Sequence, residues 1–231
     1  MPVCGSTVPD KNVSGDNFYG PLICNDQLIA YFWTTYRFRE LSPSEGGWHG
    51  GWGYEQPCDT DLPLARTFVG LYLLTYSASD WQNDGYDKPI INYARRYVRE
   101  NIDDLYARCG DGSAIARSFH GLFVDTRIEL YRGFWYDQSV VERASTFVHE
   151  ARHIGGKSHN AQFPPWSVYG PGHDGADTNW EYDGAWTYEV SYLSWFYATG
   201  TGTTTAMKNL ARQQGNLMID NAFATRPSFH I

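Results

Sequence analysis

Apolar side chains recur every three or four residues in five stretches of the chain, and this spacing predicts helices. In chain order the stretches are residues 24–41, 61–75, 87–106, 140–153 and 203–223. Start signals support the first two. Asn25 or Asp26 can cap the first helix, and Pro63 follows Asp61 in the first turn of the second. The third is expected to stop at Cys109-Gly110.

The pattern changes between residues 119 and 135, where polar and apolar residues alternate over the first half of 126–135. Alternation of this kind predicts a strand. Asp137-Gln138-Ser139 then supplies a cap for the helix that begins at Val140. The predicted order is therefore strand, short turn and helix.

Glycine and proline interrupt regular structure in two long segments. Residues 42–60 contain five glycines and three large aromatic side chains, Trp48, Trp52 and Tyr54, and so many glycines predict a loop. This loop either contacts a substrate, with His49 as an accessory group, or packs its aromatics against the protein. The second loop, residues 160–178, follows His159 directly, and a loop of that length is typically functional or mobile.

A chain of 231 residues favours one domain. We expect an irregular part at 1–60, a helical scaffold with a strand at 61–135, and a third part at 136–231. The net charge of −8 gives no electrostatic support for nucleic-acid binding, and no apolar run approaches the ~18 residues that span a membrane. Aromatic residues make up 16% of the chain, which suits a secreted protein with a large aromatic core or a peptide-binding or carbohydrate-binding groove. We expect a monomer.

The four cysteines, Cys4, Cys24, Cys58 and Cys109, lie in the first half of the chain without a CxxC pair. This arrangement favours two disulfides over a metal knuckle or free thiols, and it supports an extracellular location. Pairing Cys4 with Cys24 and Cys58 with Cys109 would tie each irregular segment to a predicted helix, although the sequence itself allows three pairings.

The strongest motif is HExxHxxGxxH, formed by His149, Glu150, His153, Gly156 and His159. Residues four apart share one face of a helix, so His149 and His153 can offer two imidazoles to one metal ion. Gly156 permits a sharp turn that brings His159 back as a third ligand. Three ligands with an open position for water are typical of a catalytic zinc site, with Glu150 as general base.

A strand followed by an HExxH helix resembles the zincin metallopeptidases, and the longer motif is similar to the metzincins. The resemblance covers about 35 residues and implies an α+β, mainly helical fold with a small sheet. It also implies that the segment near 127–135 is an edge strand that lines the cleft and receives an extended substrate. No Met-turn is identifiable, because Met207 and Met218 both fall within the helix predicted over 203–223.

Related zincins take a third ligand from further along the chain. The gluzincin pattern would make this ligand Glu189, and the aspzincin pattern would make it Asp183 or Asp177. Asp183 could also cap a helix carrying Glu189. If His159 is the ligand, Glu189 can instead accept a hydrogen bond from the ring N–H of His149 or His153.

These observations predict a secreted zinc-dependent endopeptidase that acts on protein or peptide substrates. Glu150 would take a proton from the zinc-activated water, and Tyr188, Tyr192 or His173 would stabilise the oxyanion. Two alternatives remain at this point. One is a zinc hydrolase acting on a non-peptide amide or a glycan-linked substrate, and the other is a non-enzymatic binding module that contains a metal.

Overall fold

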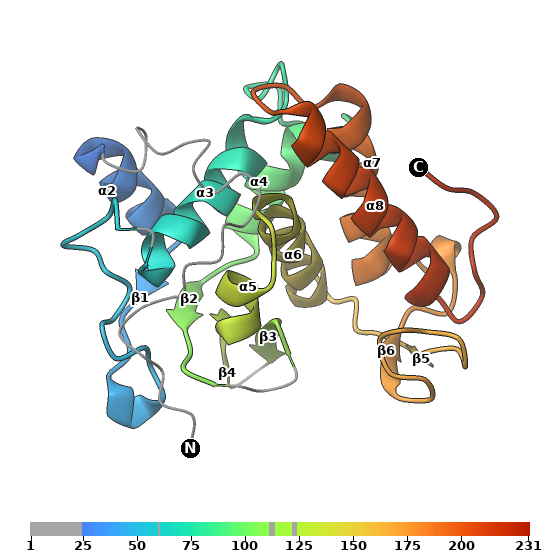
Figure 1. The fold of residues 1–231 in the computed structure, drawn as a ribbon, viewed down its shortest axis with the longest axis horizontal. Helices are drawn as coiled ribbons and strands as arrows, with labels where there is room; N and C mark the ends of the chain where they lie inside the picture. The colour runs from blue at the N-terminus through green and yellow to red at the C-terminus, as the bar shows by residue number, and fades with distance from the viewer. Residues whose placement is uncertain (1–24, 60, 111–113, 122–123) are drawn as a thin grey trace. The chain divides into compact units, whose positions relative to one another are not determined.

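A computed structural model describes residues 25–231 except 60, 111–113 and 122–123 (Figure 1). The chain divides into two compact units. The first unit comprises Met1–Leu73 with Arg99–Ala144, and the second comprises Leu74–Val98 with Ser145–Ile231. Because helices and a small mixed sheet are both present, the predicted α+β class is confirmed at this coarse level.

The first unit contains a four-stranded sheet and several helices. Its helical elements are α2 (Asp26–Thr35), η1 (Pro43–Glu45), the greater part of α3 (Pro63–Tyr76), and α5 (Arg132–Tyr136). Its strands are β1 (Phe38–Arg39), β2 (Asp104–Ala107), β3 (Ala116–Gly121) and β4 (Val124–Leu130). The strand order is β1-β2-β4-β3, with β2 parallel to both neighbours and β3 antiparallel to β4.

The second unit is mainly helical and contains a two-stranded sheet. Its elements are most of α4 (Ile90–Glu100), α6 (Val140–Ile154) from Ser145 onward, β5 (Ala161–Gln162), β6 (Asp174–Ala176), η2 (Trp180–Tyr182), α7 (Ala185–Thr199) and α8 (Thr205–Asn221). Helices α7 and α8 pack side by side (Figure 1). Met207 and Met218 both lie in α8, as the sequence predicts.

The strand before α6 is not an edge strand, so that prediction is wrong. β4 pairs with β2 on one side and with β3 on the other. Its residues Ile128 and Leu130 are completely buried. The prediction failed because the second neighbour, β2, falls in residues 104–107, which were assigned to the end of a helix.

Two boundaries explain this error. α4 ends at Glu100, and residues 104–107 form a strand in which Leu105 and Ala107 are buried while Asp104 and Tyr106 are partly exposed. That alternation is too short to outweigh the helical spacing that precedes it. Similarly, the strand expected over 126–135 stops at Leu130, and α5 follows at residues 132–136.

Most helix predictions are confirmed in position. Asn25 caps α2 by accepting a hydrogen bond from the Leu28 N–H at 2.9 Å. α3 begins at Pro63, where the missing N–H costs nothing. α6 follows Ser139, whose backbone N–H donates to Glu142 at 2.7 Å while its hydroxyl accepts from the Glu142 N–H at 3.4 Å. This reciprocal pair is a capping box.

The glycine-rich loop of the first unit packs its aromatics inward. Trp48 and Trp52 are each 1% exposed. Both contact Trp135 edge to face, with ring centroids 5.2 and 6.2 Å apart. Tyr54 is more exposed, at 39%. Burial of the two tryptophans supports the packing interpretation of this loop over substrate contact.

Cys58 and Cys109 are both disulfide-bonded. Cys4 and Cys24 lie outside the described residues, so the predicted pairings stay predictions.

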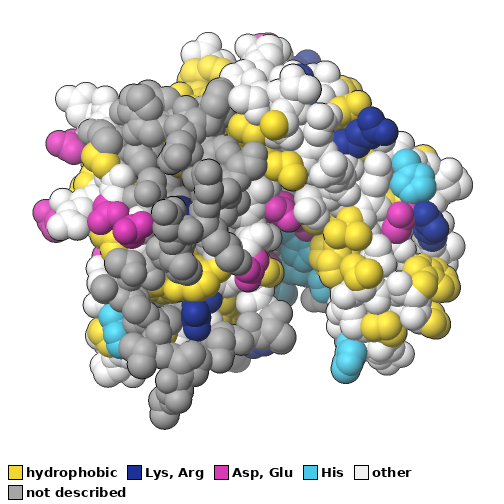
Figure 2. Space-filling model, in the orientation of Figure 1, with side chains coloured by type: hydrophobic (Ala, Val, Ile, Leu, Met, Phe, Trp, Pro, Cys, Tyr) yellow, Lys and Arg dark blue, Asp and Glu magenta, His cyan; other side chains and the backbone are white. Residues whose placement is uncertain are grey.

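The surface of the described part mixes charged and apolar side chains (Figure 2). Exposed apolar residues in the second unit include Trp166, Val168, Leu217 and Phe229. Among the described helices, none combines the length and the apolar character needed to cross a membrane.

Candidate metal centre

Helix α6 presents His149 and His153 on one face, because residues four apart lie one turn from each other. Their Nε2 atoms are 3.1 Å apart. The two rings meet at 80° with centroids separated by 4.8 Å. His149 is 8% exposed, and His153 is partly buried. The helix therefore brings two imidazole nitrogens to one point near the surface.

His159 reaches the same point from the chain beyond the helix. α6 ends at Ile154, and Gly156 has a φ of +94°, in the left-handed region that glycine adopts without steric cost. The Gly156 N–H donates to the His153 carbonyl at 2.9 Å and closes the turn. One ring nitrogen of each histidine lies within 4.8 Å of the other two. The three predicted ligands are therefore close enough to bind one metal ion.

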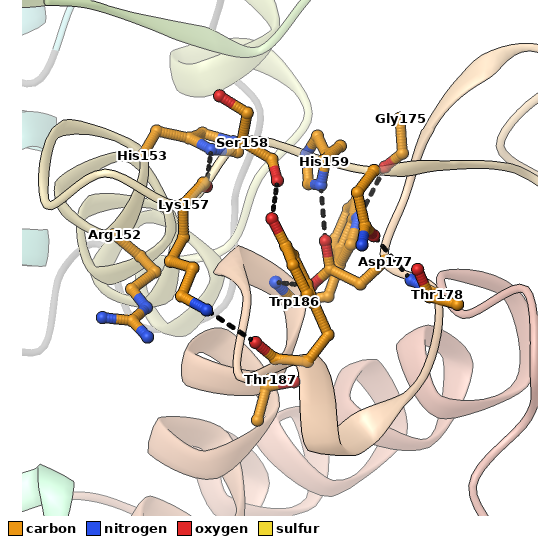
Figure 3. A network of polar contacts seen from close by, with 12 residues as sticks. Arg152, His153, Lys157, Ser158, His159, Gly175, Asp177, Thr178, Trp186 and Thr187 are labelled. Atoms are coloured by element: carbon orange, nitrogen blue, oxygen red, sulfur yellow. Dashed lines mark hydrogen bonds and ion pairs between the residues drawn. The ribbon is translucent and has the colours of Figure 1, made fainter.

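Each histidine ring also makes a hydrogen bond through Nδ1 to a group outside the cluster, which we call its outer acceptor. His149 contacts Oε2 of Glu189 at 2.9 Å, His153 contacts the Lys157 carbonyl at 2.7 Å, and His159 contacts Oδ1 of Asp177 at 2.9 Å. The contacts of His153 and His159 are drawn in Figure 3. These acceptors come from α7, from the turn after α6, and from the segment between β6 and η2. All three Nδ1 atoms are thus occupied on the side away from the cluster.

The hydrogen-bond pattern decides which nitrogen is available for a metal. A carbonyl or carboxylate accepts, so Nδ1 of each ring carries the proton and a neutral ring keeps its lone pair on Nε2. The Nε2 lone pairs of His149 and His153 then face each other at 3.1 Å, which is unfavourable without positive charge between them. Tetrahedral Zn²⁺ with Zn–N bonds of ~2.0–2.1 Å separates two ligand nitrogens by about 3.3 Å. The donor set fits such an ion.

Burial keeps the two helix histidines neutral. Burial, with a smaller contribution from His159, lowers the pKa of His149 to about 3. Burial and the neighbouring His149 lower the pKa of His153 to about 3. Neutral imidazole is the form that binds metals. Burial also raises the pKa of Glu189 to about 7, partly offset by the hydrogen bond that Ser145 donates to Oε1 at 2.7 Å.

Trp186 forms an aromatic wall beside the cluster. Its ring stacks on His159 at 23° with centroids 5.7 Å apart, and it meets His149 edge to face at 4.6 Å. Tyr169 in turn stacks against Trp186 at 16° and 5.3 Å. The indole N–H donates to the Gly175 carbonyl at 2.7 Å (Figure 3). These contacts restrict rotation of the His159 and His149 rings.

Glu150, the predicted base, follows His149 on α6 and is 6% exposed. Successive helical residues are rotated by about 100°, so Glu150 lies on the face adjacent to that of His149 and His153.

The other predicted site residues have different surroundings. Asp183 accepts a hydrogen bond from Arg152 at 2.8 Å, and its side chain is 56% exposed. It does not cap α7, because the N-cap is Gly184. Tyr188 lies beneath the Arg152 guanidinium, 4.0 Å from the ring centroid. Tyr192 is completely buried, and His173 is exposed in the loop before β6. The oxyanion roles of Tyr188, Tyr192 and His173 stay predictions.

Sequence reasoning anticipated Glu189 as an outer acceptor but did not assign this role to Asp177. Asp177 entered only as an alternative ligand, and Trp186 was not singled out. No local spacing connects residue 159 with residues 177 or 186. Their proximity depends on the path of the chain through β5, β6 and η2.

Comparison of the chain with protein-family models, with curated proteins and with solved structures gives no match.

Proposed function

We propose that the protein is a zinc-dependent metallopeptidase with the site at His149, His153 and His159. The observation that carries this proposal is the convergence of the three rings, each engaged through Nδ1 by an outer acceptor. Three nitrogen ligands suit Zn²⁺, and outer hydrogen bonds of this kind orient metal ligands and raise their basicity. The zincin-like motif HExxHxxGxxH supports the peptidase class.

A Zn²⁺ ion at this site supplies Lewis-acid activation of water and of the scissile carbonyl. Glu150 takes one proton from the attacking water and passes it to the leaving amine nitrogen, so its carboxylate is regenerated in each turnover. The hydrogen bonds at Nδ1 hold the rings of the three histidines in place. Trp186, stacked on His159, limits movement of that ring.

Secretion and action on protein or peptide substrates belong to the same proposal. Disulfide-bonded Cys58 and Cys109 support it, because disulfides persist in oxidising compartments such as the extracellular space.

Replacing Glu150 with Gln tests the mechanism. The substitution preserves the size of the side chain but removes the proton acceptor. We expect kcat/KM for a fluorogenic peptide library to fall by about 10²–10⁴-fold, the usual contribution of general acid–base catalysis. Elemental analysis should find the same zinc content as in the wild type, because Glu150 is not a ligand.

Glu181→Gln is a matched control, since Glu181 is exposed in η2 and lies outside the cluster. It should hydrolyse the library at the wild-type rate. Hydrolysis by Glu150→Gln at an unchanged rate would show that Glu150 is not the base. A wild-type protein that binds zinc but cleaves no peptide would favour a non-enzymatic metal-binding module instead.

A further inference from the structure

We propose that Asp177 is a positioning residue that makes His159 a metal ligand, by joining the ring to the first turn of α7. This inference rests on the proposed metal site. His149 and His153 are held by helix α6, but His159 lies five residues beyond its end, in a segment without regular structure. The orientation of its ring therefore depends on contacts of the side chain.

Both oxygens of the Asp177 carboxylate are in use. Oδ1 accepts from Nδ1 of His159 at 2.9 Å, and Oδ2 accepts from the backbone N–H of Trp186 at 3.1 Å. The Asp177 side chain is completely buried, and that of His159 is 21% exposed. The N–H of Trp186 belongs to the first turn of α7, where backbone donors lack partners within the helix. One carboxylate thus connects the ligand to the helix start (Figure 3).

Gly184 makes this close approach possible. A Cβ at this position would lie 2.3 Å from Oδ2 and 2.6 Å from Cγ of Asp177. The φ of Gly184 is −87°, which any residue can adopt, so the requirement for glycine is space and not backbone conformation.

The backbone of Asp177 is held independently of its side chain. Its N–H donates to the Ala222 carbonyl at 3.1 Å, and its carbonyl accepts from the Ala224 N–H at 2.9 Å. Phe223 between them is 1% exposed. Asp177 and Phe223 form a parallel bridge. The segment that follows α8 therefore anchors Asp177, and Asp177 anchors His159.

The test is the zinc affinity of Asp177→Asn, measured by competition with a chromophoric chelator. An amide has one oxygen and one NH₂ group, whereas the His159 and Trp186 N–H groups both need an acceptor. Asparagine can satisfy only one of them. We expect the affinity to fall about 10–100-fold, the usual effect of losing an outer partner. Asp174→Asn, at an exposed position in β6, is the matched control and should bind zinc normally.

A double-mutant cycle with His159→Ala separates positioning from a general structural effect. If Asp177 acts through His159, Asp177→Asn should cause no further loss of affinity in the His159→Ala background. Gly184→Ala should reproduce the loss of Asp177→Asn, because the added methyl group displaces the same carboxylate. The absorption spectrum of the Co²⁺-loaded protein should differ from that of the wild type in Asp177→Asn and in Gly184→Ala.

Three results would overturn the role of Asp177. The first is a zinc affinity of Asp177→Asn equal to that of the wild type. The second is a loss of zinc affinity from Asp177→Asn that is as large in the His159→Ala background as in the wild type. The third is a Co²⁺ spectrum of Gly184→Ala identical to that of the wild type. Failure of the wild-type protein to bind zinc would instead refute the proposed function.

Discussion

Two buried carboxylates support two of the histidines, but their surroundings differ in the number of donors that they must satisfy. Glu189 accepts from Nδ1 of His149 and from the Ser145 hydroxyl. A hydroxyl can rotate and accept instead. Asp177 faces two N–H groups, which can only donate. The same change from acid to amide should therefore have unequal effects at the two positions.

We predict that Glu189→Gln lowers zinc affinity by less than about threefold. This effect is well below the 10–100-fold loss that is typical when a metal-binding histidine loses its hydrogen-bond acceptor. The amide oxygen can accept from His149 while its NH₂ donates to Ser145. Burial already raises the pKa of Glu189 to about 7, so a neutral side chain is well tolerated. Competition with a chromophoric chelator, applied to Glu189→Gln and Asp177→Asn in parallel, measures the zinc affinity of each variant. A loss in Glu189→Gln as large as in Asp177→Asn would contradict it.

At the scale of elements, the mixed sheet carries a buried carboxylate of a different kind. Glu129 on β4 is 3% exposed. It accepts hydrogen bonds from Arg108 at 2.7 Å, from Arg127 at 3.0 Å and from Tyr131 at 3.0 Å. Burial alone would raise its pKa, but these three donors outweigh burial and hold the pKa below its usual value. Of the three donors, Arg108 connects β4 to the chain just beyond β2.

Because the folded-state pKa of Glu129 is lowered, its stabilisation is complete above the unfolded pKa of about 4.3 and is lost as the pH falls through the folded value. We predict that Glu129→Gln reduces the free energy of unfolding by about 1.5–3 kcal/mol at pH 7. The difference from wild type should shrink below pH ~4.3.

Urea denaturation at a series of pH values measures the effect of Glu129→Gln. Glu55→Gln, at an exposed position of the same unit, serves as control and should match the wild type throughout. A difference between Glu129→Gln and wild type that does not change with pH would show that the ionised form of Glu129 is not what stabilises the sheet.

For the molecule as a whole, the proposed metal centre belongs to one of the two units. The three histidines, Glu189 and Asp177 all lie within Ser145–Ile231 of the second unit. A ligand that binds only the folded state stabilises it by about 2.7 kcal/mol at a free concentration of 100 times Kd. Metal binding should therefore stabilise the second unit directly.

We predict that chelation lowers amide-exchange protection in α6, α7 and the 177–178 segment, while β2 and β4 of the first unit keep theirs. Hydrogen exchange read by mass spectrometry, with and without a chelator, measures this. Re-addition of Zn²⁺ should restore protection. Equal losses of protection in β4 and α7 would contradict a stabilisation confined to the second unit.

Features with local causes are predictable from the amino-acid sequence. The i, i+4 spacing of His149 and His153, a cap before Val140 and a turn at Gly156 each involve only neighbouring residues, and all three predictions are confirmed. The parallel pairing of residues 104–107 and the interior position of β4 depend on strands distant in the chain, so hydrophobic spacing alone assigned them wrongly.

The surroundings of the three histidines depend on tertiary packing. Asp177 and Glu189 lie 18 and 40 residues from the histidines that they contact. Which of several carboxylates supports a ring depends on how β5, β6 and α7 pack, and not on spacing along the chain. Residues close in sequence interact through helix and turn geometry, whereas distant residues meet only when the folded chain brings them together.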